Sequence, residues 1–435
     1  MPTKPDAPVL LDVRDLKVHF ALRGSFLQRM VGRDTGSVKA VDGVSFSLRK
    51  GEVLGLVGES GSGKTTLSRA VLSLVKVTSG SIAFDGETIS DLTERQFRPL
   101  RKRMQLIFQD PHASLNPAMT ILQAVGHPLR IHHVANSDAD VQARVSEALE
   151  RVGLVPVERF LYKYPGDLSG GQKQRAVLAR AIILGPDLVV ADEPVSMLDM
   201  SVRAKVLELM GDLKRGLGLT YLYVTHDLAT ARYFCDRIAI MYLGRIVEIG
   251  SAAEIYANPR HPYTKALLEA IPEPDPRRAI PRDLPRGEVP DAVLPPLGCS
   301  FHPRCPRAFE RCGWESRDLR SMLEARWAAL GPEEFQRERG IVGALNGLDA
   351  PSTEAVVHAA RGHQGSEVTG LLAEHRAATS DDPIWKGVES IETMPGAVKV
   401  RFLAHEDPRL QPIANGGEEP VEVACHLYGS GAVAR

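Results

Sequence analysis

The chain has 435 residues, 43% of them apolar and 25% charged, so it can bury one large core with an extension, or two cores. Its net charge of −1 provides no global basic field, which argues against a nucleic-acid partner. No apolar run approaches the roughly 18 residues of a membrane span, and the N-terminus lacks the pattern of a signal peptide. We therefore expect a cytosolic protein whose five cysteines stay reduced.

Predicted elements change in type along the chain. Residues 10–55 alternate short apolar segments with turn signals, which predicts strands and hairpins. Residues 64–75 and 137–153 have helical spacing of apolar positions. Buried strands are predicted again at 187–192 and 219–227, each after a helical stretch. This order of strand, helix and strand indicates a parallel sheet with crossover helices.

A phosphate-binding loop is predicted at residues 58–65, GESGSGKT, between the apolar strand VLGLV and a helix. The segment fits the pattern G-x-x-x-x-G-K-[ST], whose glycines let consecutive N–H groups point into one concavity. Lys64 should bridge the β- and γ-phosphates of a nucleotide, and Thr65 should ligate Mg²⁺. An ordinary glycine-rich turn is the alternative. The predicted nucleotide contacts are Gly58, Ser60, Gly61, Ser62, Gly63, Lys64, Thr65 and Thr66.

Two carboxylates end the predicted strand LVVADE. Asp192 is the candidate partner of Mg²⁺, and Glu193 is the candidate base that polarises the attacking water. Such a pair at a strand end is usually a solvated cap, but the phosphate loop upstream favours a catalytic role. The two residues must differ in role, because a cation neutralises one while the other accepts a proton.

The pentapeptide LSGGQ at 168–172 precedes that strand and resembles the signature sequence of ABC ATPases. Taken alone, it could be a serine N-cap followed by a helix. The resemblance implies that the signature contacts the γ-phosphate held by a second ATPase subunit, identical or homologous, so that two domains sandwich two nucleotides. The signature residues assigned to the nucleotide are Ser169, Gly170, Gly171 and Gln172.

The other positions that carry catalytic residues in this family also have the expected residues here. The resemblance therefore implies an active ATPase. Gln109 matches the glutamine that senses the metal and the γ-phosphate, and His226 matches the switch histidine. Asp199 matches the acid of the loop that crosses the dimer interface. Phe20 stands where the family stacks an aromatic ring on adenine, although a lone aromatic in a strand is more often part of a core.

Two further segments, 110–117 and 261–267, resemble the oligopeptide/dipeptide/nickel importer branch. Just before the signature, however, Gly166-Asp167 stands where this branch usually has His-Glu or His-Gln. The resemblance implies a peripheral ATPase at the cytoplasmic face of the membrane. It would pair with two permease subunits, one docking near 109–119, and work indirectly with an extracytoplasmic solute-binding protein. The transported solute would be a peptide or a similar small molecule. A soluble ABC ATPase of DNA repair or translation is the alternative, but neither a second cassette nor a coiled-coil insertion is visible.

The predicted fold class is α/β, a P-loop NTPase core with an antiparallel β subdomain, a helical subdomain and a small cysteine-bearing C-terminal module. The predicted domains are a nucleotide-binding domain at 1–271 with its helical subdomain at about 110–180, a proline-rich linker at 272–298, a cysteine module at 299–312 and 421–435, and an insertion at 313–420. Within the insertion, residues 319–330 and 352–362 look helical, and 396–405 look strand-like. We assign the insertion no function.

Four cysteines mark the C-terminal module: Cys299, Cys305, Cys312 and, beyond the insertion, Cys425. Four thiolates can hold a 4Fe-4S cluster or a structural zinc ion, and bare thiols are the third alternative. The resemblance implies an iron–sulfur cluster in some members of the branch, so we predict a 4Fe-4S cluster here. Cys235 is expected to be a small buried residue.

Overall fold

The structure is a computed structural model and describes residues 7–22, 36–271, 287–413 and 420–428. The chain forms two compact units, residues 1–258 with 416–421, and residues 259–415 with 422–435. Most of the predicted linker, and part of the predicted C-terminal module, lie outside the described residues.

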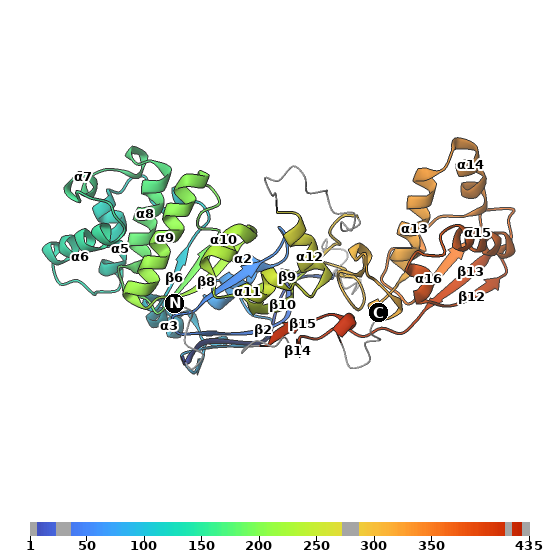
Figure 1. Cartoon of the computed structure of the whole chain (residues 1–435), viewed down its shortest axis with the longest axis horizontal. Helices are drawn as coiled ribbons and strands as arrows, with labels where there is room; N and C mark the ends of the chain where they lie inside the picture. Colours follow the sequence, from blue (N-terminus) through green and yellow to red (C-terminus); the bar gives the residue numbers. More distant parts are fainter. Residues whose placement is uncertain (1–6, 23–35, 272–286, 414–419, 429–435) are drawn as a thin grey trace, which may run out of the picture. The chain divides into compact units, whose positions relative to one another are not determined.

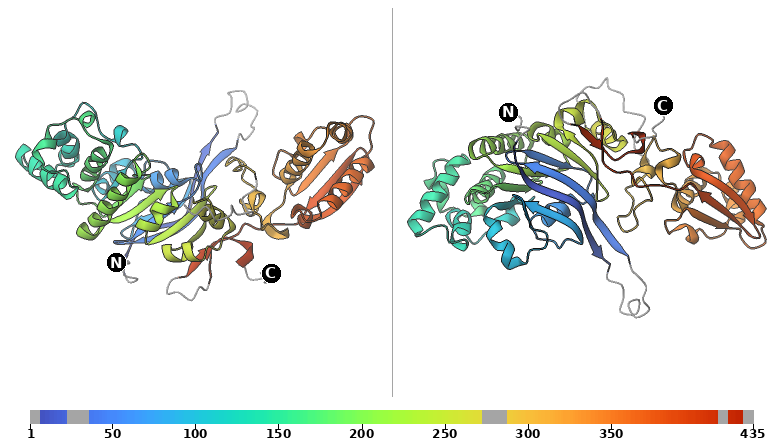
Figure 2. Two further views of the ribbon diagram at one scale, coloured as in Figure 1. Left: turned by 45° about the horizontal axis from the view of Figure 1, so that its top comes forward. Right: turned by 90° about the horizontal axis from the view of Figure 1, so that it is seen from below.

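The first unit begins with an antiparallel sheet in the order β2-β1-β4-β5. Its strands are β1 (Val9–Ala21), β2 (Ser37–Arg49), β4 (Ser79–Phe84) and β5 (Glu87–Thr88). The paired strands β1 and β2 are the longest in the unit and stand out in both views of Figure 2. This sheet confirms the antiparallel β subdomain that the alternation in residues 10–55 predicts.

A second, mostly parallel sheet carries the phosphate loop. Its strands in this unit are β3 (Val53–Val57), β6 (Met104–Ile107), β7 (Leu188–Asp192), β8 (Thr220–Thr225), β9 (Arg237–Tyr242) and β10 (Arg245–Ser251). They run in the order β10-β9-β3-β8-β7-β6, with β9 and β10 antiparallel and the rest parallel. All residues of β3, β7 and β8 are buried, as expected of parallel strands covered on both faces. Because β3 and β7 both flank β8, their carboxyl ends reach the same edge.

Helices of the first unit form two groups. Those near the sheets are α2 (Lys64–Val71), α3 (Glu94–Phe97), η1 (Arg98–Lys102), α9 (Met200–Leu217), α10 (Leu228–Phe234) and α11 (Ala252–Ala257). The helical group comprises α4 (Pro111–Ser114), α5 (Ile121–Ile131), α6 (Asp138–Arg151), α7 (Glu158–Leu161), η2 (Pro165–Asp167) and α8 (Gly170–Ile182). Helices α5, α6, α7 and α8 lie together in Figure 1. In α6 the apolar positions Val141, Val145 and Leu149 are buried, so the periodic pattern predicts this helix correctly. No helix within the described ranges is long and apolar enough to cross a membrane.

The second unit contains the predicted insertion as a folded α+β element. Before the insertion lie α12 (Pro262–Glu269), η3 (His302–Arg304) and η4 (Glu310–Cys312). The insertion has α13 (Ser316–Ala329), α14 (Pro332–Ile341), η5 (Asn346–Leu348), β11 (Glu354–His358), α15 (Gly365–Ala378), α16 (Ile384–Gly387), β12 (Val388–Met394), β13 (Ala397–Phe402) and β14 (Gln411–Ile413). The chain continues with β15 (Val421–Val423) and η6 (His426–Tyr428).

Helix α15 packs on an antiparallel sheet in the order β11-β13-β12, which gives the insertion a core of its own. The core includes Leu323, Val357 and Val400. The helical appearance of 352–362 is misleading, because Val356 and Val357 pair with β13 and form the strand β11. The insertion also holds all three tryptophans of the chain, and all are buried: Trp314, Trp327 and Trp385.

Candidate nucleotide-binding site

The phosphate loop connects β3 to α2 and is curled around the Lys64 side chain. Lys64 Nζ donates hydrogen bonds to the carbonyl oxygens of Gly58 and Glu59, both at 2.8 Å. Burial lowers the pKa of the Lys64 ammonium group, while the nearby carboxylates of Glu193 and Asp192 oppose that shift. The loop therefore already presents a cation and the N-terminus of α2 to an incoming anion.

Thr65 and Asp192 place two oxygen atoms beside the loop. Thr65 Oγ1 donates to Asp192 Oδ1 at 3.3 Å, across the neighbouring ends of α2 and β7. Burial raises the pKa of the Asp192 carboxyl, and the adjacent Glu193 carboxylate raises it further. A hydroxyl and a carboxylate oxygen are ligands that suit Mg²⁺, so the donor set fits the predicted metal.

Glu193 follows β7, and both of its carboxylate oxygens have a partner. Gln109 Nε2 donates to Glu193 Oε2 at 3.0 Å, and His226 Nδ1 lies 2.9 Å from Glu193 Oε1. Gln109 follows β6, and His226 follows β8, so three strand ends bring these side chains together. The Glu193 backbone has a φ of +49°, in the left-handed region that non-glycine residues rarely adopt.

The signature segment begins α8 with a reciprocal cap. Gln172 N donates to Ser169 Oγ at 3.3 Å, and Ser169 N donates to Gln172 Oε1 at 3.0 Å. Gly170 and Gly171 form the first turn, whose N–H groups have no carbonyl partner earlier in the helix. Ser169 lies outside the hydrogen-bonded group around Glu193, and its contact with the nucleotide of a second subunit stays a prediction.

Asp199 and Phe20 are not among the hydrogen-bond partners of Glu193 that the structure describes. Asp199 is the residue before α9, and its side chain does not cap that helix. Phe20 lies on β1 opposite Val38 of β2, and 44% of its surface is exposed. An exposed ring on a strand is available to a planar ligand, but the contact with adenine stays a prediction.

Two residues near the site have no counterpart in the sequence predictions. Arg203, on the first turn of α9, donates from Nη1 to Asp227 Oδ2 at 3.0 Å. Asp227 follows His226 and caps α10 through its other oxygen, accepting from Ala229 N at 2.9 Å. The N-cap could have been read from an aspartate ahead of a helical run. Nothing local in the sequence signals Arg203, because its partners lie in other loops.

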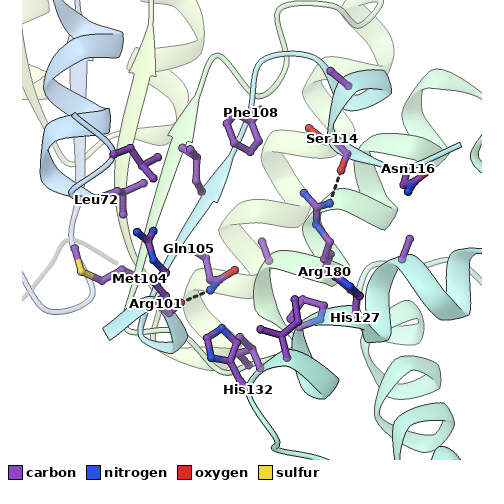
Figure 3. Close-up of a pocket in the computed structure, with 18 of the residues that line it drawn as sticks. Leu72, Arg101, Met104, Gln105, Phe108, Ser114, Asn116, His127, His132 and Arg180 are labelled. Atoms are coloured by element: carbon purple, nitrogen blue, oxygen red, sulfur yellow. Dashed lines mark hydrogen bonds between the residues drawn. The ribbon is translucent and has the colours of Figure 1, made fainter. Parts of the chain in front are cut away.

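A groove of about 540 Å³ lies beside α4 and α5 (Figure 3). Its lining is apolar at Leu72, Met104 and Phe108, and it carries cationic groups at Arg101 and Arg180. The Arg180 guanidinium of α8 donates to the Ser114 carbonyl oxygen of α4. Arg101 is already paired with the Glu94 carboxylate at 2.8 Å. The groove therefore suits an apolar segment, with Arg180 as the cationic group that could face an acidic side chain.

Together, the phosphate loop, the acidic strand end and the signature helix, arranged around a parallel sheet, define a P-loop ATPase of the ABC class. Family models support this conclusion. The model described as "ABC transporter" matches residues 41–196, and the model described as "Oligopeptide/dipeptide transporter, C-terminal region" matches residues 247–312.

Curated relatives identify the branch. A peptide import ATP-binding protein of Brucella ovis is 47% identical over 320 residues, which cover 74% of this chain and 96% of that protein. The oligopeptide transport ATP-binding protein AppF of Bacillus subtilis is 46% identical, over 71% of this chain and 93% of that protein. The oligopeptide transport ATP-binding protein OppF of Salmonella typhimurium is 46% identical, over 70% of this chain and 90% of that protein. The chain belongs to this family of ABC transporter ATP-binding proteins and is an ATPase, as the resemblance predicts.

The prediction of a 4Fe-4S cluster is wrong. Cys299, Cys305, Cys312 and Cys425 are buried around one cavity, but its volume of about 10 Å³ has room for about one water molecule. Over the described ranges, no three histidine, cysteine, aspartate or glutamate residues are arranged to hold a metal ion. Burial raises the pKa of Cys299 and Cys312 to about 12, which favours neutral thiols. The relatives named above are likewise described simply as ATP-binding proteins. Sequence spacing cannot tell packed thiols from ligating thiolates.

Proposed function

We propose that this chain powers the uptake of peptides or similar small solutes by hydrolysing ATP at the site around Lys64 and Glu193. The observation that carries the proposal is the convergence of Lys64, the Thr65–Asp192 pair and Glu193 at the carboxyl ends of β3 and β7. The names of the relatives support peptides as the solute class, since they denote peptide and oligopeptide transport.

Each residue of the site has a separate role in this proposal. Lys64 turns from the loop carbonyls to the β- and γ-phosphates, which have a stronger negative charge than a carbonyl oxygen. Thr65 and Asp192 would hold Mg²⁺, which neutralises charge on the phosphates when bound. Glu193 accepts the proton of the attacking water, and His226 and Gln109 orient its carboxylate. Burial around Asp192 strengthens each of these electrostatic interactions.

The proposed partner for hydrolysis is a second ATPase subunit, identical or homologous. Ser169 and the first turn of α8 would bind the γ-phosphate held by that subunit, because the free N–H groups of a helix start attract anions. Asp199 would contact the partner across the interface. Neighbouring Met197 and Met200 are 64% and 84% exposed, as expected of a surface that a partner covers.

The proposed membrane partners are two permease subunits, with the chain bound peripherally at the cytoplasmic face. The groove beside α4 and α5 is the proposed docking site for a permease helix. Its apolar lining matches the apolar face of such a helix, and Arg180 matches an acidic side chain, since Arg101 is paired with Glu94. A solute-binding protein outside the membrane would deliver the solute to the permeases.

Three substitutions test the hydrolysis site. Glu193→Gln should keep ATP binding and lower turnover by about 100-fold or more, because the amide cannot accept the proton. Lys64→Ala should weaken ATP binding itself. Glu208→Gln is the matched control, since Glu208 is an exposed glutamate on α9. Turnover and ATP affinity are measured on the assembly that co-purifies with the tagged chain. Equal turnover of the wild type and Glu193→Gln would remove Glu193 from the mechanism.

A further inference from the structure

We infer that Arg203 is a positioning residue that closes a ring of contacts around Glu193 and keeps this base aligned with the loop 196–199. The inference rests on the proposed function, because it concerns the same hydrolysis site. It adds a residue that touches neither the phosphate loop nor the proposed metal ligands.

Arg203 holds two loops at once. Its Nη1 atom donates to Asp227 Oδ2 at 3.0 Å, on the loop after β8. Its Nη2 atom lies 3.5 Å from the Ser196 carbonyl oxygen and 3.4 Å from the Leu198 carbonyl oxygen, on the loop after β7. One guanidinium therefore joins the loop that carries the switch histidine to the loop proposed to cross the dimer interface.

Both loops lead back to Glu193. On one side, Ser196 N and Ser196 Oγ donate to the Glu193 carbonyl oxygen at 3.2 and 3.0 Å. On the other side, Asp227 directly follows His226, whose Nδ1 atom is 2.9 Å from Glu193 Oε1. The contacts form a closed ring through Glu193, Ser196, Arg203, Asp227 and His226. Removal of the Arg203 side chain breaks the ring on the side opposite Glu193, because it removes the contacts that join Asp227 to the loop 196–199.

Glu193 needs such support because its backbone conformation is unfavourable. A non-glycine residue in the left-handed region persists where the surrounding structure holds it, and such residues cluster at functional sites. Glu193 N is also bound to the Val224 carbonyl oxygen at 2.9 Å, so the backbone is held from both sides. The ring then fixes the direction in which the carboxylate points.

The Arg203 side chain is poorly suited to a purely stabilising role. Its Nε atom is buried and has no hydrogen-bond partner within the ranges that the structure describes. An unpaired buried donor is unfavourable for folding. The position nevertheless has an arginine, whose planar fork can reach acceptors on two loops where a shorter or single-donor side chain reaches one.

The kinetic test compares Arg203→Met and Arg203→Lys with Arg215→Met. Arg215 is the matched control, because it lies on the same helix in an exposed pair with Asp212. We expect Arg203→Met to lower kcat about 10-fold or more with KM for ATP changed less than about twofold, since the base is misdirected but the phosphate loop is intact. Arg203→Lys should recover part of the loss through a donor to Asp227, and Arg215→Met should match the wild type. The assay uses the assembly that co-purifies with the tagged chain.

Hydrogen exchange on the purified chain provides a second measurement. Arg203→Met should speed amide exchange in both 194–199 and 226–230, because the ring joins these loops. Faster exchange confined to the start of α9 would contradict the inference that Arg203 joins the two loops. A kcat of Arg203→Met equal to that of Arg215→Met would contradict it as well. Parallel losses of kcat, ATP affinity and thermal stability, without recovery by lysine, would reduce Arg203 to a structural residue. If Glu193→Gln is inactive while Arg203→Met is fully active, this inference fails and the proposed function stands.

Discussion

Gly63 is the residue at which the phosphate loop depends most directly on the absence of a side chain. It precedes α2 with a φ of +100°, and a Cβ atom there would lie 2.0 Å from the Ala40 carbonyl oxygen. Gly61 also has a positive φ, of +79°, but a Cβ atom there would meet nothing within 4 Å. A substitution at Gly63 therefore combines backbone strain with a steric clash, whereas one at Gly61 introduces backbone strain alone.

Gly63→Ala should abolish ATP binding and lower the free energy of unfolding by more than the ~1 kcal/mol expected from left-handed strain alone. The loop would have to move away from β2 to admit the methyl group. Gly61→Ala, with strain but no clash, should retain weaker binding and most of the stability. Calorimetric ATP titrations and chemical denaturation of both variants measure the difference. Equal behaviour of the two variants would show that the contact with Ala40 is unimportant.

Sequence predicts the residues of this site better than it predicts their contacts. Lys64, Thr65 and the pair Asp192-Glu193 could be found because each belongs to a short local pattern whose chemistry is known. Arg203 could not, because it reaches backbone carbonyls and an aspartate 24 residues away. The cysteines show the opposite error, because the family resemblance implies a ligand set that the packing does not form.

At the scale of elements, α5 ends at Ile131, which lines the groove and is 44% exposed. Ile131→Glu should prevent co-purification of the permease subunits, because it adds an acid where we propose that acidic and apolar permease side chains dock. ATP binding should be unaffected. Leu217→Glu is the control, since Leu217 is the exposed last residue of α9 and lies outside the groove. Undiminished recovery of membrane subunits with Ile131→Glu would exclude this groove as the docking site.

Helix α12 begins with a histidine cap that depends on pH. His261 Nδ1 accepts a hydrogen bond from Tyr263 N at 3.0 Å, and burial lowers the pKa of His261 to about 3. The unfolded chain binds more protons than the folded chain between about pH 3 and 6.5, so this contribution to stability is present above pH 6.5 and is lost as the pH falls. Asparagine can cap the helix but cannot gain this proton.

We therefore expect the wild type to lose about 2 kcal/mol more stability than His261→Asn between pH 7 and pH 5. Denaturant unfolding at both pH values measures the difference, and the titrations shared by the two proteins cancel in the comparison. Parallel pH profiles would mean that His261 can take up a proton in the folded chain.

Elements with a clear apolar run or helical spacing of apolar residues are predicted well from the sequence. Strands that depend on pairing with a distant segment are not. The buried strands β7 and β8 and the helix α6 follow from apolar runs and helical spacing. The strand β11 looks helical because alanine and glutamate surround Val356 and Val357, and its partner β13 lies some 40 residues later. Local propensity is weak evidence where such long-range pairing decides the outcome.

At the scale of the whole molecule, the ATPase site lies within the first compact unit, and the insertion within the second. The relative from Brucella ovis aligns with 74% of this chain, so about a quarter of the chain has no counterpart in it. The insertion 313–420 has its own helices, sheet and apolar core. We expect the two units to unfold as separate cooperative transitions, because each encloses its own core.

Saturating MgATP should raise the midpoint of the transition of the first unit by about 5–10 °C and leave the other transition unchanged, since a ligand stabilises the unit that binds it. Differential scanning calorimetry with and without MgATP resolves the two transitions. A single transition that shifts as a whole would show that the units are coupled. Lys64→Ala, which should not bind ATP tightly, is the control for the shift.

The location of the three tryptophans has a practical consequence. Trp314, Trp327 and Trp385 are buried in the insertion, and the unit that binds ATP contains none. Intrinsic tryptophan emission therefore reports on the insertion and should stay constant in a nucleotide titration even when binding is complete. A silent emission signal would not be evidence against binding, and a tryptophan introduced beside the phosphate loop would give the ATPase unit an optical signal of its own.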